Sequence, residues 1–249
     1  MKIGFKVSAA LLAACLTVSL FGCTNSGELK QKGKLIMATN AAFEPFEFQK
    51  DGKIVGIDVD IATDIAKDMG VTLEIQNMNF DSVVTSVSSG KADVGIAGLT
   101  ENPTRANSVD FTDTYYDASQ VIIVKQNNTA ITGKDSLKNK KIAVQKGTTG
   151  DDVATKITGD ANVERFSAST DAVSELKNGK VDAVVIDSFP AKVFVKQNSD
   201  LKLTGSGLTS EKYSIAVRKG NTKLVEQINK SLKKLKDNGT LDTIIQKYS

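Results

Sequence analysis

The two halves of this chain repeat one order of elements, and no other feature constrains the fold as much. A strand-like run at residues 34–37 is matched by another at residues 141–144, and a loop and a helical pattern follow each of them. Residues 90–96 are likewise matched by residues 179–185. Strands that alternate with helices are typical of α/β architecture. The repeat predicts two α/β lobes of similar design; chance recurrence of a common helix–glycine–strand unit is the alternative.

Hydrophobic spacing places the expected elements. Apolar residues at every fourth position from residue 57 to residue 69 predict a helix, which Gly70 ends. Asp81 is expected to cap a second helix that runs to Gly90. Further elements are expected as strands at residues 35–38, 73–75 and 93–97 and as a helix at residues 222–236, and residues 121–125 and 213–217 are two further apolar runs.

The C-terminal helix is expected to return to the lobe in which the chain begins. The chain then crosses between the lobes twice, and two crossing segments form a hinge whose bending opens and closes a cleft. We therefore expect lobe 1 at residues 34–116 and 215–249 and lobe 2 at residues 117–214. The polar residues 23–33 are expected to form a tether.

Residues 1–22 have the pattern of a secretory signal peptide. Lys2 and Lys6 precede an apolar run that is shorter than the roughly 20 residues of a membrane span. Residues 20–23, Leu-Phe-Gly-Cys, resemble the lipobox of bacterial lipoproteins. This resemblance implies cleavage before Cys23 and a diacylglycerol on its thiol, and two acyl chains make a stable anchor. The expected location is extracytoplasmic, at the cell membrane; an ordinary signal peptide is the alternative.

The composition excludes several kinds of chemistry. The chain has no histidine, which excludes Ser-His-Asp and Cys-His catalysis and histidine metal ligands. Without the signal peptide, 30 basic and 29 acidic residues remain, so no strong field favours nucleic acid. Cys15 is lost with the signal peptide, which leaves Cys23 without a partner for an intramolecular disulfide. We expect no cofactor and no metal.

Polar residues follow the expected strands at the sheet edge where ligands bind in open α/β sheets. In the first half, Thr100 and a helix start at residues 102–103 precede Arg105. In the second half, a turn with Thr148 and Thr149 precedes a helix. Free amides at a helix start, together with a guanidinium, predict an anion site.

Asp187 supplies the opposite charge in the second half. It follows the strand-like residues 184–186 and suits an ammonium group. A cation on one lobe and an anion on the other complement a zwitterion, which predicts an α-amino acid as the ligand. Three alternatives stay open at this point: Arg105 on the surface of a helix, Asp187 as the cap of the next helix, and Phe43 in the core.

Five motifs carry a resemblance to a known family. They are residues 38–48, residues 56–60, residues 97–100 with Arg105, residues 182–187 and residues 236–240. Together they resemble the polar amino-acid-binding proteins of bacterial ABC importers (family 3 extracellular solute-binding proteins). The resemblance implies a two-lobed fold of the type II periplasmic-binding-protein class, with two doubly wound α/β lobes. A two-segment hinge is expected near residues 116–119 and 211–215.

The resemblance also implies how the backbone groups of an amino acid would be held. Arg105, Thr100 and Thr149 would bind its carboxylate. Asp187 and the carbonyl of Gly98 would bind its ammonium group.

The side-chain pocket departs from the patterns of known relatives. Phe43 would stack on the ligand side chain. Many relatives that bind cationic amino acids have aspartate where this chain has Asn40, and glutamine-binding relatives have an aromatic residue at Ile57, lysine at Gln145 and histidine at Ile186. These departures predict a largely neutral pocket for a polar uncharged or sulphur-containing amino acid. The expected ligand-binding residues are Asn40, Phe43, Ile57, Gly98, Thr100, Arg105, Gln145, Thr148, Thr149 and Asp187.

The leading hypothesis is a monomeric, lipid-anchored receptor that closes on an L-amino acid and hands it to the permease of an ABC importer. Closure lets the ligand bridge both lobes, so that binding shifts the open–closed equilibrium. The first alternative is a cyclohexadienyl-dehydratase-like enzyme, because such enzymes share the bilobed fold and Asp187 or Glu44 would serve as an acid–base group. The second is a sensor that reports its ligand to a membrane partner.

Overall fold

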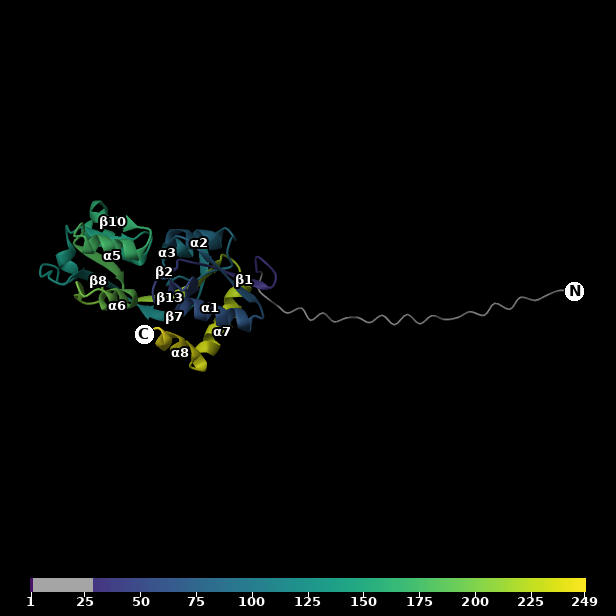
Figure 1. Ribbon diagram of the computed structural model, residues 1–249. Helices are drawn as coiled ribbons and strands as arrows, with labels where there is room; N and C mark the ends of the chain where they lie inside the picture. Colours follow the sequence, from purple (N-terminus) through teal and green to yellow (C-terminus); the bar gives the residue numbers. More distant parts are fainter. Residues whose placement is uncertain (2–28) are drawn as a thin grey trace.

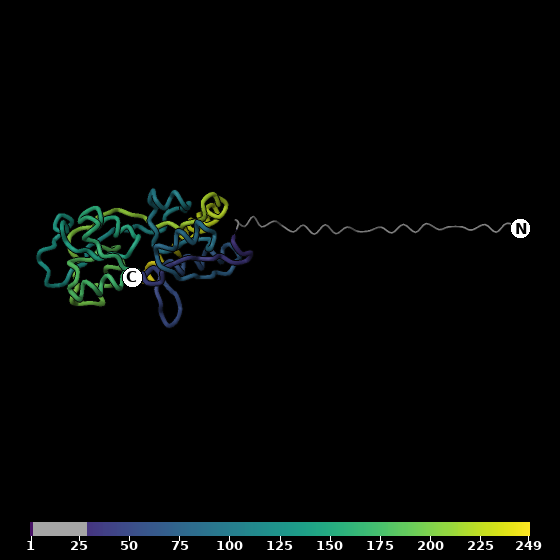
Figure 2. The backbone as a smooth tube through the Cα atoms, turned by 90° about the horizontal axis from the view of Figure 1, so that it is seen from above, coloured from purple at the N-terminus to yellow at the C-terminus, as the bar shows by residue number. Residues whose placement is uncertain are grey.

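In the computed structural model the chain forms two α/β lobes that lie side by side along the long axis of the molecule (Figure 1). The structure describes Met1 and residues 29–249. The expected signal peptide and Cys23 lie outside the described residues. The C-terminus lies at the boundary between the two lobes in both views (Figures 1 and 2).

Lobe 1 is built on a five-stranded sheet in the order β5-β1-β6-β13-β7. Its strands are β1 (Lys34–Thr39), β5 (Thr72–Asn77), β6 (Val94–Gly95), β7 (Val109–Ala118) and β13 (Glu211–Arg218). β1 pairs in parallel with β5 and β6, whereas β13 pairs antiparallel with β6 and β7. The sheet is therefore mixed, with its parallel strands on one side.

Helices cover both faces of this sheet, because alternate residues of a strand point to opposite sides. Leu35 and Met37 of β1 belong to a core cluster that includes α1 (Ile57–Asp68) and α7 (Thr222–Asp237). Ile36 belongs to a second cluster, which includes α2 (Phe80–Ser88). Burial on both faces explains why the middle of β1 is apolar at every position.

Lobe 2 repeats the plan in a sheet of the order β10-β9-β11-β8-β12. Its strands are β8 (Gln120–Lys125), β9 (Ile142–Gln145), β10 (Val163–Phe166), β11 (Ala183–Asp187) and β12 (Leu201–Thr204), and its α-helices are α4 (Thr149–Thr158), α5 (Ser169–Lys177) and α6 (Ser188–Gln197). β9 pairs in parallel with β10 and β11, as β1 does with β5 and β6. The two-lobed α/β fold expected from the repeated sequence pattern is confirmed.

The chain passes between the two sheets twice. β7 ends at Ala118 and β8 begins at Gln120, and the return runs from the end of β12 to the start of β13. After β13, α7 packs against β7 and α1, and α8 (Thr240–Lys247) packs against α7 and α1. The C-terminal helices therefore lie on the first sheet, as the sequence predicts, while the residue limits of the lobes stay a prediction.

Some local expectations are wrong. Asn79 is the N-cap of α2, so Asp81 lies in the first turn and does not cap the helix. The strand expected at residues 93–97 pairs only at residues 94–95, because the carboxylate of Asp93 is bonded to the Ile36 N–H and the chain turns at Gly98, where φ is +54°. The sequence does not predict the small sheet of β2 (Ala42–Phe43), β3 (Glu47–Lys50) and β4 (Lys53–Val55).

Candidate functional site

A small cavity lies where the carboxyl ends of the strands of both lobes meet. Its lining residues are Phe43, Phe80, Ala97, Gly98, Arg105, Gln145, Thr148, Thr149 and Asp187. Seven of the ten residues expected from the sequence to bind a ligand are therefore brought together around one space. Phe80 and Ala97 were not expected there.

Arg105 enters the cavity from the short helix α3 (Pro103–Ala106). Asn102 begins this helix and its side chain accepts the Arg105 N–H at 2.8 Å. Arg105 is only 8% exposed, which contradicts the alternative of a surface arginine. It donates to the Thr100 carbonyl at 2.7 Å and to the Gly147 carbonyl of lobe 2 at 2.9 Å.

The charge of Arg105 has no counter-ion within ion-pair distance in the described part of the chain. Its guanidinium carbon lies 5.2 Å from the centre of the Phe80 ring, and its two donated bonds go to neutral carbonyls. Burial lowers the pKa of Arg105, but a guanidinium remains protonated in proteins. A buried cation held only by neutral groups is a strong site for a carboxylate.

Asp187 is the last residue of β11 and is 7% exposed. It occupies the N-cap position of α6, yet its side chain makes no capping bond. One carboxylate oxygen instead accepts the Tyr213 hydroxyl at 2.5 Å. Burial raises the pKa of Asp187 to about 6. The alternative in which Asp187 serves only as a helix cap is therefore wrong.

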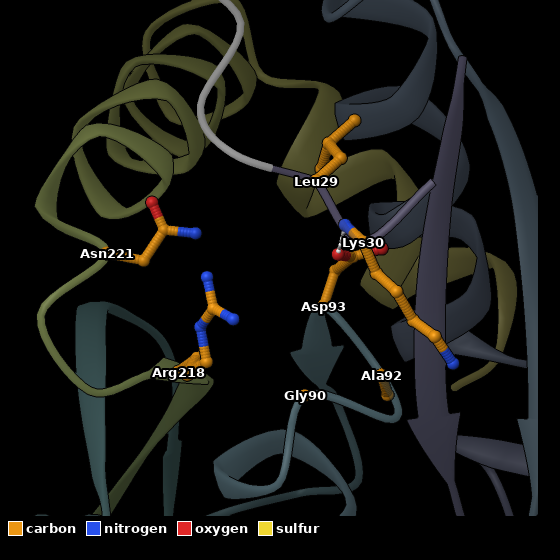
Figure 3. Close-up of a pocket in the computed structure, with 7 residues that line it drawn as sticks. All are labelled: Leu29, Lys30, Gly90, Ala92, Asp93, Arg218 and Asn221. Carbon is orange, nitrogen blue, oxygen red and sulfur yellow. Dashed lines mark hydrogen bonds between the residues drawn. The ribbon is translucent and has the colours of Figure 1, made fainter. Parts of the chain in front are cut away.

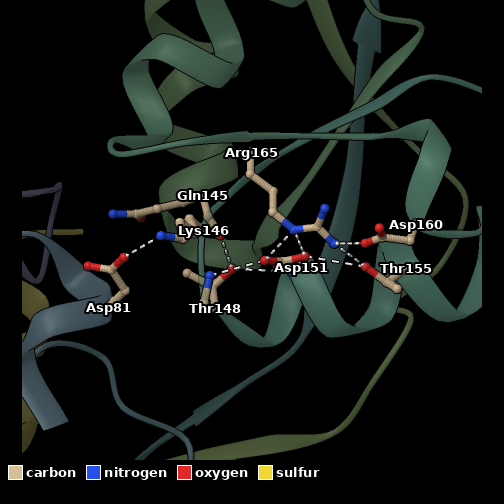
Figure 4. Close-up of polar contacts among 9 residues, drawn as sticks. Asp81, Gln145, Lys146, Thr148, Asp151, Thr155, Asp160 and Arg165 are labelled. Carbon is tan, nitrogen blue, oxygen red and sulfur yellow. Dashed lines mark hydrogen bonds and ion pairs between the residues drawn. The ribbon is translucent and has the colours of Figure 1, made fainter. Parts of the chain in front are cut away.

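The turn before α4 completes the cavity wall in lobe 2, and Figure 4 shows what holds it. Thr148 is the N-cap and accepts the Asp151 N–H at 3.2 Å, and Thr149 begins the helix. The carboxylate of Asp151 accepts the Gly147 N–H at 3.1 Å and pairs with Arg165 at 2.8 Å. The helix start is thus held rigidly next to Arg105, where its amides favour an anion.

The lobes also contact each other directly around the cavity. Gln145 of lobe 2 donates to the Asn40 side chain at 2.8 Å and to the Ser167 carbonyl at 3.0 Å. Lys146 and Asp81 form an ion pair across the rim at 3.0 Å (Figure 4). Asn40 therefore contacts a lining residue without lining the cavity itself.

The rim ion pair leads to a prediction about affinity. We expect Lys146→Ala to weaken ligand binding by no more than about fivefold, because an exposed pair contributes about 0.2–1 kcal/mol. The loss should shrink between ionic strengths of about 0.01 M and 1 M, where the Debye length falls from about 30 Å to about 3 Å. Titration calorimetry measures both. Lys180→Ala removes a similarly exposed pair, with Glu175, elsewhere in lobe 2 and should leave the affinity unchanged. A salt-independent loss above tenfold contradicts the prediction.

Two other expected residues lie outside the cavity wall. The Thr100 hydroxyl donates to Glu211 at 3.0 Å, while its carbonyl accepts from Arg105. Ile57 is fully buried in the core at the start of α1. Phe43 is 7% exposed, lines the cavity and stacks on Phe46, so the core and the site share this ring.

Four other hollows in the described part of the chain carry none of the ten expected ligand-binding residues. The one in Figure 3 is open to solvent, lies in lobe 1 and is lined by Leu29, Lys30, Gly90, Ala92, Asp93, Arg218 and Asn221. Its carboxylate, Asp93, is already bonded to the N–H groups of Lys30 and Ile36. In the part of the chain that the structure describes, no helix is long and apolar enough to cross a membrane, and no cluster of side chains suits a metal ion.

Two α/β lobes around a small cavity, with a buried cation from one and a buried carboxylate from the other, define a binding protein of the type II periplasmic class. Comparison with known proteins then gives the family. The chain matches the bacterial extracellular solute-binding proteins, family 3, over residues 35–249 and belongs to that family. The family that its motifs resemble is confirmed.

Individual relatives cover nearly the whole chain. ArtP, an arginine-binding extracellular protein of Bacillus subtilis (strain 168), is 35% identical over 245 residues, which are 96% of this chain and 95% of that protein. The structure of an ancestral arginine-binding protein bound to arginine is 44% identical, with a TM-score of 0.84 over 87% of this chain and 98% of that one. The structure of an ancestral arginine-binding protein bound to glutamine is 43% identical, with a TM-score of 0.83, and covers 88% and 98% of the two chains.

Proposed function

We propose that this protein is an extracellular receptor that binds an L-amino acid between its lobes and delivers it to an ABC importer. One observation carries the proposal: Arg105 and Asp187 line the same cavity, and among the described residues neither forms an ion pair. A zwitterion would supply a carboxylate to the first and an ammonium group to the second. The names of the relatives, all receptors for amino acids, support the same ligand class.

The walls of the cavity favour a ligand side chain that ends in a flat polar group. The phenyl rings of Phe43 and Phe80 line it, and aromatic faces attract guanidinium groups and stack on planar ones. Gln145 adds amide hydrogen-bonding groups. We therefore propose arginine or glutamine as the preferred ligand. Glutamine agrees with the neutral pocket expected from the sequence, whereas arginine, a cation, departs from that expectation.

A screen of the twenty amino acids and cystine by thermal unfolding tests this proposal. A ligand at a hundred times its dissociation constant should add about 2.7 kcal/mol of stability. We expect arginine or glutamine to give the largest shift. A larger shift with cystine contradicts the proposed side-chain class, and no shift with any of these ligands contradicts the receptor function. Recovery of the ligand unchanged after incubation separates a receptor from the dehydratase-like enzyme.

The pKa of Asp187 predicts how affinity depends on pH. The ammonium group needs the ionised carboxylate, and burial raises the pKa of Asp187 to about 6, so affinity should fall as pH falls through about 6. At pH 5 only about a tenth of the protein has ionised Asp187, which weakens binding about tenfold relative to pH 8. Calorimetry at both pH values measures this change. An affinity that is constant or rises toward pH 5 contradicts the assigned role.

We also propose that the receptor is held at the membrane by a diacylglycerol on Cys23, after removal of residues 1–22. The sequence Leu-Phe-Gly-Cys at residues 20–23 supports this anchor. Expression of Cys23→Ala in a bacterial host is the test. Release of the variant from the membrane fraction is expected, and membrane retention equal to the unchanged chain contradicts the anchor.

A further inference from the structure

A second buried carboxylate lies directly behind the cavity, and the proposed function does not use it. Asp58 sits in the first turn of α1 and is fully buried. One of its oxygens accepts the Gly98 N–H at 2.8 Å and the other accepts the Tyr115 hydroxyl at 2.9 Å. Both bonds therefore go to groups outside its own helix.

Glu47 is a second buried carboxyl group that neighbours Asp58. It is fully buried in β3, and in the described part of the chain no donor is bonded to either of its oxygens. Burial, followed by the charge of Asp58, raises the pKa of Glu47 well above its usual range. The two buried carboxyl groups therefore disfavour ionisation of both at once.

Gly98 is the residue of the cavity wall that Asp58 holds. Its φ of +54° is in the left-handed region, and a Cβ there would lie 2.9 Å from the Phe43 ring and 3.3 Å from the Tyr213 ring. Only glycine fits this place, so Gly98 can offer the ligand only backbone groups. Its N–H is committed to Asp58, which leaves its carbonyl, an acceptor suited to an ammonium group.

We propose that Asp58 is a positioning residue for ligand recognition, because it fixes the Gly98 backbone that presents an acceptor to the ammonium group of the ligand. The inference rests on the proposed amino-acid receptor function. A charge-assisted hydrogen bond to a buried carboxylate immobilises an otherwise permissive glycine. Lobe 2 contains the same arrangement beside the carboxylate site, where Asp151 in the first turn of α4 holds the Gly147 N–H.

The test compares an amino acid with its analogue that lacks the α-amino group. The ligand pairs are L-arginine with 5-guanidinopentanoate and L-glutamine with 4-carbamoylbutanoate, measured by calorimetry or by competition. The amide of an asparagine has a single acceptor oxygen, so Asp58→Asn keeps an acceptor for only one of the two donors that Asp58 accepts. We expect this variant to weaken binding of the amino acid about tenfold or more. Binding of the analogue should change by less than about threefold.

A matched variant separates positioning from general damage. Asp151→Asn removes the corresponding carboxylate in lobe 2, near the ligand carboxylate that both members of a pair carry. This variant should weaken binding of the amino acid and of its analogue by the same factor, so that the ratio of the two affinities stays as in the unchanged protein. If Asp58→Asn also weakens binding of the amino acid and of its analogue equally, or leaves both affinities unchanged, the inference is overturned.

A second variant keeps the test valid if Asp58→Asn does not unfold cooperatively. Tyr115→Phe keeps the ring and removes one donor to the same carboxylate. The ratio of the amino-acid affinity to the analogue affinity should fall about two- to fivefold. An unchanged ratio overturns the inference. If the unchanged protein binds none of the amino acids, the proposed function itself fails. Binding by the unchanged protein with an unaltered ratio in the Asp58 variant defeats only the positioning role.

Discussion

Replacing Arg105 with alanine should weaken amino-acid binding about 30-fold to several thousandfold. The guanidinium is the only cation lining the cavity in the described structure, and truncation leaves the ligand carboxylate buried without a charged partner. Loss of one member of such a pair costs about 2–5 kcal/mol, and 1.4 kcal/mol corresponds to a factor of ten. Titration calorimetry with arginine and glutamine measures the loss.

Two companion variants show whether charge or geometry matters. Arg105→Lys keeps the charge but lacks the planar fork, which now reaches the carbonyls of both Thr100 and Gly147. We expect it to recover only part of the affinity. Arg218→Ala removes an exposed arginine that lines the separate hollow of Figure 3, and it should leave binding within about twofold. Affinity of Arg105→Ala within threefold of the unchanged protein contradicts the assigned role.

The two charged residues of the site could be found from the sequence because each follows directly on a local pattern. Arg105 comes after a cap and a proline that begin a helix, and Asp187 ends an apolar strand. The carboxyl ends of parallel strands meet at one edge, so the topology brings such residues together. The repeat of the two halves therefore determines most of the site.

The residues that the sequence did not reveal depend on contacts between distant segments. Tyr213 reaches Asp187 because β13 returns to the first sheet, and Asp58 reaches Gly98 across 40 positions of the chain. No local pattern encodes either contact. Phe80 was missed because Asn79 and Asp81 are both good helix caps, and placing the helix start at Asp81 leaves the preceding ring in a loop.

The position of Ile57 in the core also could not be predicted from the sequence. Its position at the start of α1 suggested a place beside the ligand, but the side chain is fully buried in the core. The first turn of a helix has an inner and an outer side, and sequence position alone does not say which of these faces the cavity.

Asp187→Asn should abolish most of the affinity and at the same time stabilise the protein that has no ligand. The ammonium group would lose its counter-ion, which weakens binding about 30-fold or more. Asparagine keeps an acceptor for the Tyr213 hydroxyl, so the local packing should persist. The gain in stability arises because burial of the ionised carboxylate costs more than its neutral hydrogen-bond donors return.

The sign of the stability change follows from the pKa of Asp187, which burial raises from 3.8 to about 6 in the folded protein. The folded state then binds the proton more tightly than the unfolded state, so this group lowers the free energy of unfolding as pH rises from about 4 to about 6. Above pH 6 the full penalty, roughly 3 kcal/mol, is present. Asp187→Asn should remove it at pH 7.5 and have little effect near pH 3.

Urea unfolding of both proteins at the two pH values, without amino acid, measures the difference directly, and titrating groups that Asp187 does not influence cancel in the comparison. Asp200→Asn changes an exposed aspartate of lobe 2 and should stay within about 0.5 kcal/mol at both pH values. Destabilisation of Asp187→Asn at pH 7.5, or unaltered amino-acid affinity, contradicts the prediction. A residue whose charge destabilises the free receptor yet is needed to hold the ligand gives up stability for binding, as a functional site does.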